Sequence, residues 1–356
     1  MNYALPCKSA AQSEQLSGEK MKTRISILAA SLVLIAIPAK AQDAPPLKLA
    51  QTITLPPDAT GQFDHFGIDL KGDRLFATPE GSKSVRVFEL KSGKPIHTIA
   101  GIEKPHAVLY REDLDRIYVT DGEAGDLKIF DAKTYKLLST VKLLEDADSI
   151  GYDAKTKYLY IDNGGGDVHQ TYSMLSVVDT TAAKKVADIK IDGETLEAMA
   201  LESSTSRLYV NNKARNKVDV VDRNTRAIVA SWPVTKCKTN VAMALDEANH
   251  RLFIACRTAS MVVMDTQSGK EITALPITKG VDDAVYDAAS KRIYAAADGN
   301  VDVYQQTSPD EYKLLAQIPT GPMARTARLV PELKRYFVAV PQHGTDPAKI
   351  LIFDVL

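Results

Sequence analysis

The 356-residue chain has one tryptophan, three cysteines and almost no net charge, with 44 Lys+Arg against 45 Asp+Glu. This balance and a pI of about 6.6 argue against a general nucleic-acid binder, which normally carries a basic surface. No cysteine stands in a C-x-x-C or Cys/His spacing, so common zinc-binding and haem-attachment motifs are excluded.

Familiar catalytic motifs are also missing. The sequence contains no G-x-S-x-G elbow, no H-E-x-x-H, no Walker loop and no G-x-G-x-x-G following a strand. The glycine-rich stretch at residues 163–173 joins two predicted strands and does not open a helix. We therefore expect a loop there rather than a phosphate-binding turn.

The N-terminal region has one long apolar run, Ile25 to Ile37. Two basic residues precede it, and the small-x-small sequence Ala39-Lys40-Ala41 follows it. This order is typical of a secretory signal peptide, and the run is too short for a transmembrane helix. We predict an upstream extension (1–20), a signal peptide (21–41), a short linker (42–46) and a periplasmic or secreted domain (47–356) without a membrane span after cleavage.

A repeated unit fills the rest of the chain. Each unit has an apolar strand, a polar turn and a second strand with an aromatic residue, followed by a third strand and usually a fourth. The second strands are DRLFATP (73–79), DRIYVTD (115–121), KYLYIDN (157–163), SRLYVNN (206–212), HRLFIAC (250–256), KRIYAAA (291–297) and KRYFVAV (334–340). Markers at Leu75, Ile117, Leu159, Leu208, Leu252, Ile293 and Tyr336 are 42, 42, 49, 44, 41 and 43 residues apart.

Four short strands in each repeat of this length predict an all-β, seven-bladed β-propeller. The seventh unit ends after its third strand, ILIFDVL. An unattached strand, LKLAQTITLP (47–56), follows the predicted signal peptide. Supplying that N-terminal strand to the last blade would close the ring and remove an exposed sheet edge.

The segments RIYVT (116–120) and RLYVN (207–211), each followed by a turn and a V-x-V-x-D-like strand, resemble the YVTN-repeat β-propeller family. The resemblance covers essentially all of residues 47–356. It implies a propeller fold, whereas relatives differ in function and include exported binding proteins and lactonase-like enzymes.

Superposing the units predicts a polar ring at one end of the central channel. The residue eleven before each marker precedes an innermost strand, and six of these seven residues are ionisable: Asp64, His106, Asp148, Glu197, Asp282 and Arg325, with Val241 as the exception. Neighbouring positions and loops on the same face add His65, Asn240, Arg257, Asp283 and His343. Solvated strand ends are the alternative interpretation, but a mixed polar mouth is typical of a ligand site.

Cys237 and Cys256 fall at the same end of the fifth unit. An oxidising compartment permits a disulfide between them, and two buried free thiols are the alternative.

Two functions fit these residues. The first is an exported, monomeric, non-enzymatic propeller that binds a small molecule or a protein partner at the polar mouth. The second, implied by the family resemblance, is a lactonase-like hydrolase or lyase. A divalent cation such as calcium would then lie on Asp64, Asp148, Glu197 and Asp282, with His106 or His65 as general base and Arg325 or Arg257 stabilising negative charge. A redox propeller fits worst, because tryptophan docking motifs and C-x-x-C-H are absent.

Overall fold

The computed structural model describes residues 44–356. The predicted upstream extension and signal peptide (1–41), together with residues 42 and 43 of the linker, lie outside the described residues. Within residues 44–356, no helix has the length and hydropathy required to cross a membrane.

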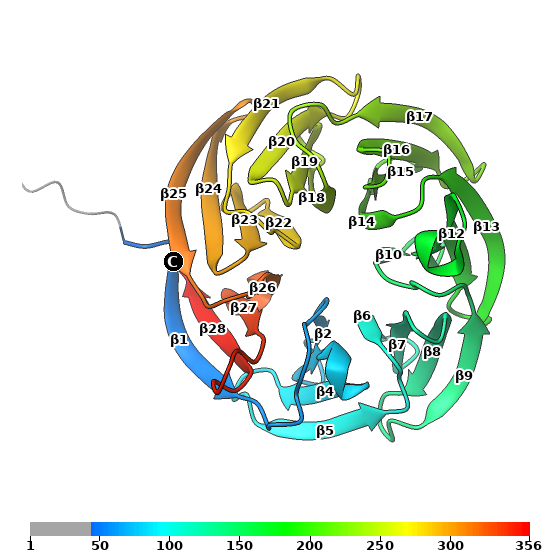
Figure 1. Ribbon diagram of the computed structural model, residues 1–356, viewed down its shortest axis with the longest axis vertical. Coiled ribbons are helices and arrows are strands. Elements are labelled where there is room, and N and C mark those ends of the chain that lie inside the picture. Colours follow the sequence, from blue (N-terminus) through cyan, green and yellow to red (C-terminus); the bar gives the residue numbers. More distant parts are fainter. Residues whose placement is uncertain (1–43) are drawn as a thin grey trace, which may run out of the picture. The chain divides into compact units, whose positions relative to one another are not determined.

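Seven four-stranded antiparallel sheets form a ring, as Figure 1 shows down the central axis. Blade 1 contains β2 (Gly67–Asp69), β3 (Arg74–Ala77), β4 (Ser84–Glu89) and β5 (Pro95–Ala100). Blade 2 contains β6 (Pro105–Arg111), β7 (Arg116–Asp121), β8 (Asp126–Asp131) and β9 (Leu137–Lys142). Blade 3 contains β10 (Ile150–Asp153), β11 (Tyr158–Gly164), β12 (Tyr172–Asp179) and β13 (Lys184–Asp192). Blade 4 contains β14 (Leu196–Leu201), β15 (Arg207–Asn212), β16 (Lys217–Asp222) and β17 (Ala227–Pro233).

The remaining blades continue this order. Blade 5 contains β18 (Asn240–Asp246), β19 (Arg251–Cys256), β20 (Ser260–Asp265) and β21 (Glu271–Pro276). Blade 6 contains β22 (Asp283–Asp287), β23 (Arg292–Ala297), β24 (Asn300–Ser308) and β25 (Glu311–Pro319). Blade 7 contains β26 (Thr326–Val330), β27 (Arg335–Val340), β28 (Lys349–Val355) and β1 (Leu47–Thr54). Three short 3-10 helices lie in loops: η1 (Glu80–Ser82), η2 (Gly165–Val168) and η3 (Pro331–Leu333).

The second strand of each blade is buried on both faces because neighbouring blades pack against it, which explains its nearly continuous apolar sequence. The aromatic residue at the same position of each of these strands is at most 1% exposed. These residues are Phe76, Tyr118, Tyr160, Tyr209, Phe253, Tyr294 and Phe337. Burying one such side chain contributes about 2–3 kcal/mol, so this layer supplies much of the core.

Closure of the ring by the N-terminal strand is confirmed. β1 pairs with β28 in an antiparallel register that runs from Leu47 opposite Val355 to Thr54 opposite Lys349. Figure 1 shows the first described strand beside the last one at the rim of the ring. The prediction of a seven-bladed, all-β propeller is therefore confirmed as well.

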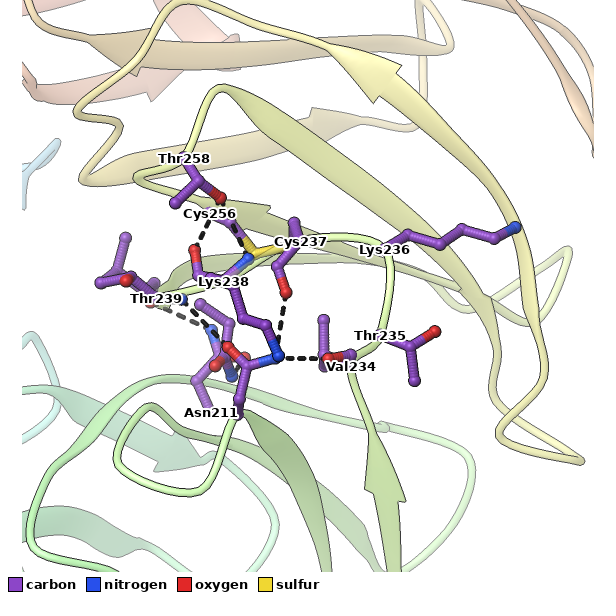
Figure 2. The surroundings of a disulfide bond; sticks show 12 residues. Asn211, Val234, Thr235, Lys236, Cys237, Lys238, Thr239, Cys256 and Thr258 are labelled. Carbon is purple, nitrogen blue, oxygen red and sulfur yellow. Dashed lines mark hydrogen bonds between the residues drawn. A yellow bond between two sulfur atoms is a disulfide. The ribbon is translucent and has the colours of Figure 1, made fainter.

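A disulfide joins Cys237, in the loop before β18, to Cys256 at the end of β19 (Figure 2). Their Cα atoms are 6.1 Å apart, and 19 positions separate them in the sequence. Thr258 braces the loop, because its hydroxyl accepts a hydrogen bond from Lys238 N (3.0 Å) and donates one to Lys238 O (2.9 Å). The bond therefore fixes the loop that enters the innermost strand of blade 5.

Replacing both cysteines by alanine is expected to lower the free energy of unfolding by about 3 kcal/mol, because a closed loop of this length restricts the unfolded chain. Urea denaturation of oxidised protein checks this value. Reductant should shift the wild-type midpoint toward that of the Cys237→Ala/Cys256→Ala variant and leave the variant unchanged. Equal midpoints for both oxidised proteins would contradict the expectation.

Candidate functional site

Five ionisable side chains from four blades meet where the innermost strands begin. Asp64 and His65 precede β2, His106 is the second residue of β6, Asp148 precedes β10 and Asp283 begins β22. We call Asp64, His65, His106, Asp148 and Asp283 the imidazole–carboxylate cluster. It combines residues 218 positions apart in the sequence, because closing the ring brings blade 6 close to blade 1.

Asp64 lies between the two histidines of this cluster. Its Oδ2 atom is hydrogen-bonded to His106 Nδ1, and its Oδ1 atom lies 3.4 Å from His65 Nε2. His106 Nδ1 is also 3.5 Å from Asp148 Oδ1, and His65 Nδ1 is 3.0 Å from Asp283 Oδ1. Each imidazole thus has two carboxylates beside it.

The other predicted ring members form separate ion pairs. Glu197 pairs with Lys213 from the β15–β16 loop. The Asp282 carboxylate is held between Arg257, from the β19–β20 loop, and Arg325, whose Nε lies 3.0 Å from Asp282 Oδ2. The sequence placed Lys213 in a possible basic rim with Arg257, but it did not indicate the pairing of Lys213 with Glu197.

Two predicted residues do not join these groups. Asn240 is fully buried and donates hydrogen bonds to Asn211 Oδ1 (2.9 Å) and Lys217 O (3.0 Å), so its side chain braces blade 5 against blade 4. His343 is exposed in the β27–β28 turn, where its backbone pairs with Asp346.

The cluster favours protonated imidazoles. Burial opposes a positive charge on His106, but the carboxylates of Asp148 and Asp64 outweigh it and raise the pKa of His106 to about 10. The pKa of His65 is likewise raised well above its ordinary value by Asp283 and Asp64, against the effect of burial. Both imidazoles are therefore protonated on both ring nitrogens and positively charged at neutral pH.

The pKa values of the two central carboxyl groups, Asp64 and Asp148, shift in opposite directions. Burial disfavours the Asp64 carboxylate, yet His65 and His106 outweigh it and lower the pKa of Asp64 to about 2. Burial and repulsion from Asp64 raise the pKa of Asp148 to about 8. The pair can thus hold one exchangeable proton near neutral pH, a pattern typical of acid–base and polar binding sites.

Three side chains of the cluster meet the spacing needed for a cation. Ligand atoms of Asp64, His65 and Asp148 all lie within 4.8 Å of one another, as do those of Asp64, Glu80 and His106. Among the described residues, neither of these two groups includes Glu197 or Asp282, and each of these carboxylates is paired with a cationic side chain. The calcium set of Asp64, Asp148, Glu197 and Asp282 stays a prediction, and Ca²⁺ normally takes six to eight oxygen ligands.

His106 Nε2 is buried and has no hydrogen-bond partner among the described residues. It packs against Gly122, where an added Cβ would approach this nitrogen to 2.5 Å. Buried polar atoms are normally paired, and an exception calls for an explanation such as a bound group. Gly122 therefore belongs with the site, although a glycine in a loop gave no signal in the sequence.

A cavity of about 310 Å³ lies in the channel beside the cluster. His65 and Asp283 line it together with residues of the innermost strands of several blades, including Phe66, Leu109, Ser149, Ile150, Met199 and Arg328. Its volume and its mixture of apolar walls with a few polar groups are those of a small-molecule pocket. Ser149, beside Asp148 at the entry of β10, and Arg328, inside β26, were not among the predicted site residues.

No family model matches this sequence, and no curated protein matches it. Solved structures do match the fold. One is hydrazine synthase of Kuenenia stuttgartiensis, with a TM-score of 0.68, 15% identity, and coverage of 85% of this chain and 98% of that chain. Another is a chain of the mitotic checkpoint complex, with a TM-score of 0.70, 13% identity, and coverage of 94% and 99%. These similarities support the propeller fold alone, and membership of the YVTN-repeat family stays a prediction.

Proposed function

We propose that this protein is an exported, non-enzymatic propeller that binds a small polar molecule at the channel mouth formed by the imidazole–carboxylate cluster. The observation that carries the proposal is the convergence of Asp64, His65, His106, Asp148 and Asp283 beside a cavity of about 310 Å³. A protein partner at the same mouth is the other form of this binding function. Export rests on the predicted signal peptide.

Burial and charge support a binding role over a purely structural one. Packing two imidazoles against three carboxyl groups costs desolvation free energy. The attraction within a buried ion pair rarely exceeds this cost, so such pairs seldom stabilise the fold. The side chains of Asp64, His65, Asp148 and Asp283 nevertheless stay between 17% and 29% exposed, so a ligand can reach them. Such a cluster supplies both hydrogen-bond donors and acceptors to a polar ligand.

Binding is tested by screening a panel of amino acids, sugars, carboxylic acids, amines and lactones for stabilisation and calorimetric binding. For any panel member that binds the wild-type protein, we expect Asp64→Asn to lower the binding affinity at least about tenfold. The variant removes the carboxylate that lies between the two imidazoles. His250→Asn is the matched control. His250 lies at the opposite end of the ring with φ of 56°, a conformation that Asn tolerates.

Two results would contradict this proposal. One is the failure of every panel class to bind the folded wild-type protein. The other is a binder whose affinity is the same for Asp64→Asn and the wild type.

A lactonase-like hydrolase is the second candidate, favoured by one specific observation. Asp148, whose pKa is raised to about 8, adjoins Asp64, whose pKa is lowered to about 2, and this pairing suits a proton donor beside a stable anion. Asp64, His65 and Asp148 would be the residues nearest a bound cation. Stoichiometric divalent metal together with lactone turnover that Asp148→Asn abolishes would favour this function. Metal-free protein that is inert toward a lactone panel would exclude it.

A further inference from the structure

Among the seven equivalent positions on the innermost strands, one holds a charged residue, Arg328. The seven innermost strands share a register in which one residue pairs with the buried aromatic of the second strand. These residues are Gly67, Leu109, Gly151, Ala200, Ala244, Val285 and Arg328. Six are small or apolar, as expected where seven strands crowd around an axis, and the seventh is an arginine.

The Arg328 guanidinium forms no hydrogen bond or ion pair with any described residue. The charges of Asp283 and Glu332 act on Arg328, but neither carboxylate bonds to it. Asp283 is already engaged. Its Oδ2 accepts the Ala327 N–H at 2.8 Å, and its Oδ1 pairs with His65. Arg328 is exposed to the channel, so its guanidinium donors are open to an anion and have no bond to a described residue to break.

The surroundings of Arg328 define the class of anion. Arg328 lines the cavity of about 310 Å³ and also a second cavity of about 310 Å³ toward the opposite face, so its side chain lies between the two. Phe66, Val108, Leu109 and Ile150 provide apolar walls in the first cavity. The other cation of this cavity, His65, is paired with Asp64 and Asp283, so Arg328 is the lining cation that has no carboxylate partner among the described residues. One unpaired cation beside apolar walls suits a single negative charge on an apolar skeleton and disfavours a multiply charged ion.

We propose that the channel binds a small organic monocarboxylate whose carboxylate pairs with Arg328 and whose apolar part contacts the innermost strands of blades 1 to 3. A planar guanidinium can donate two parallel hydrogen bonds to a carboxylate, a geometry that neither a neutral amide nor a lysine reproduces. The inference rests on the proposed function, because it takes the cavity beside the mouth as the binding site.

The test uses butanoate and benzoate as probes, each compared with its primary amide and with inorganic phosphate, in calorimetric titrations of the full chain. We expect at least one carboxylate to bind one-to-one, and its amide and phosphate to bind at least about tenfold more weakly. Arg328→Gln should lose about tenfold or more in carboxylate affinity, and Arg328→Lys should lose less. Arg215→Gln, which removes the same charge from an exposed loop pair, should bind like the wild type.

Thermal unfolding without probe separates binding from a structural role. Arg328→Gln should unfold close to the wild-type temperature, because the variant changes an exposed side chain that forms no bond with a described residue. The proposal is overturned if neither carboxylate binds, if Arg328→Gln binds as tightly as the wild type, or if Arg328→Gln unfolds well below the wild type while Arg328→Lys does not.

The same titrations distinguish this inference from the proposed function. Carboxylate binding that is lost in Asp64→Asn and kept in Arg328→Gln would support the mouth as the site and overturn the role of Arg328. Binding lost in Arg328→Gln and kept in Asp64→Asn would support the anion site and contradict a ligand held by the imidazole–carboxylate cluster.

Discussion

Deleting residues 44–55 should abolish the cooperatively folded state. This segment contains β1, the outer strand of blade 7, and it buries Leu47, Ile53 and Leu55 to 8% exposure or less. Burying each of these side chains contributes about 1.5–3 kcal/mol, and the pairing with β28 is lost as well. The combined loss is comparable with the 5–15 kcal/mol that stabilises a typical domain. Circular dichroism during urea titration should show no cooperative transition in the deletion variant.

A circular permutant is the matched control for this deletion. Leu47 lies opposite Val355, and Leu356 N donates a hydrogen bond to Pro46 O at 3.1 Å, so a short turn can join the end of β28 to the start of β1. A chain that begins at residue 56 and carries residues 44–55 after Leu356 should unfold cooperatively. A deletion variant as stable as the full chain would show that β1 is dispensable.

Alkaline pH should destabilise the protein through the imidazole–carboxylate cluster. The pKa of His106 is about 10 in the folded state and near 6.5 in an unfolded chain, so between these values the folded state holds the additional proton. Stability from this group is complete below about pH 6.5 and is lost as the pH rises through 10. One proton changes the free energy of unfolding by about 1 kcal/mol or more per pH unit, or about 4 kcal/mol from pH 7 to pH 10.

Asp148 acts in the same direction at lower pH. Its pKa is raised to about 8 in the folded state from 3.8, so the folded state holds the additional proton between these values and stability again falls as pH rises. Urea denaturation at a series of pH values measures both slopes.

The variant His106→Gln tests whether His106 causes the fall in the free energy of unfolding between pH 7 and pH 10. It should be less stable than the wild type at pH 6, because the Asp64 carboxylate loses the cation bonded to it, and its stability should change much less between pH 7 and pH 10. His250→Asn, at the other end of the ring, should keep the wild-type slope. An identical slope in His106→Gln and wild type would contradict the assignment to His106.

Most of the fold could be predicted from the period of the sequence repeat. Markers 41 to 49 residues apart, each followed by a buried aromatic, fix the number of blades, because every unit must bury its second strand against two neighbours. The missing fourth strand after residue 356 and the spare strand near residue 47 likewise predicted closure. Both inferences needed only local strand patterns and the rule that sheet edges are covered.

The candidate site could be predicted only in part. Counting within the repeat placed Asp64, His106 and Asp148 at neighbouring strand entries, and the structure brings these three into contact. In blade 5 the same counting gave Val241, and its neighbour Asn240, which was added to the site, has its side chain in the interface with blade 4. Successive side chains of a strand alternate in direction, so a shift of one residue separates a channel-facing group from a blade-facing one.

The sequence by itself determined a ring of seven blades and the end of the channel at which charged residues gather, because both follow from periodicity. Only the tertiary structure decided which charges pair. His65 pairs with Asp283 and Glu197 pairs with Lys213, while Arg328 has no partner within residues 44–356. Side-chain direction and ring closure set these distances, and neither is encoded in the spacing of residues along one strand.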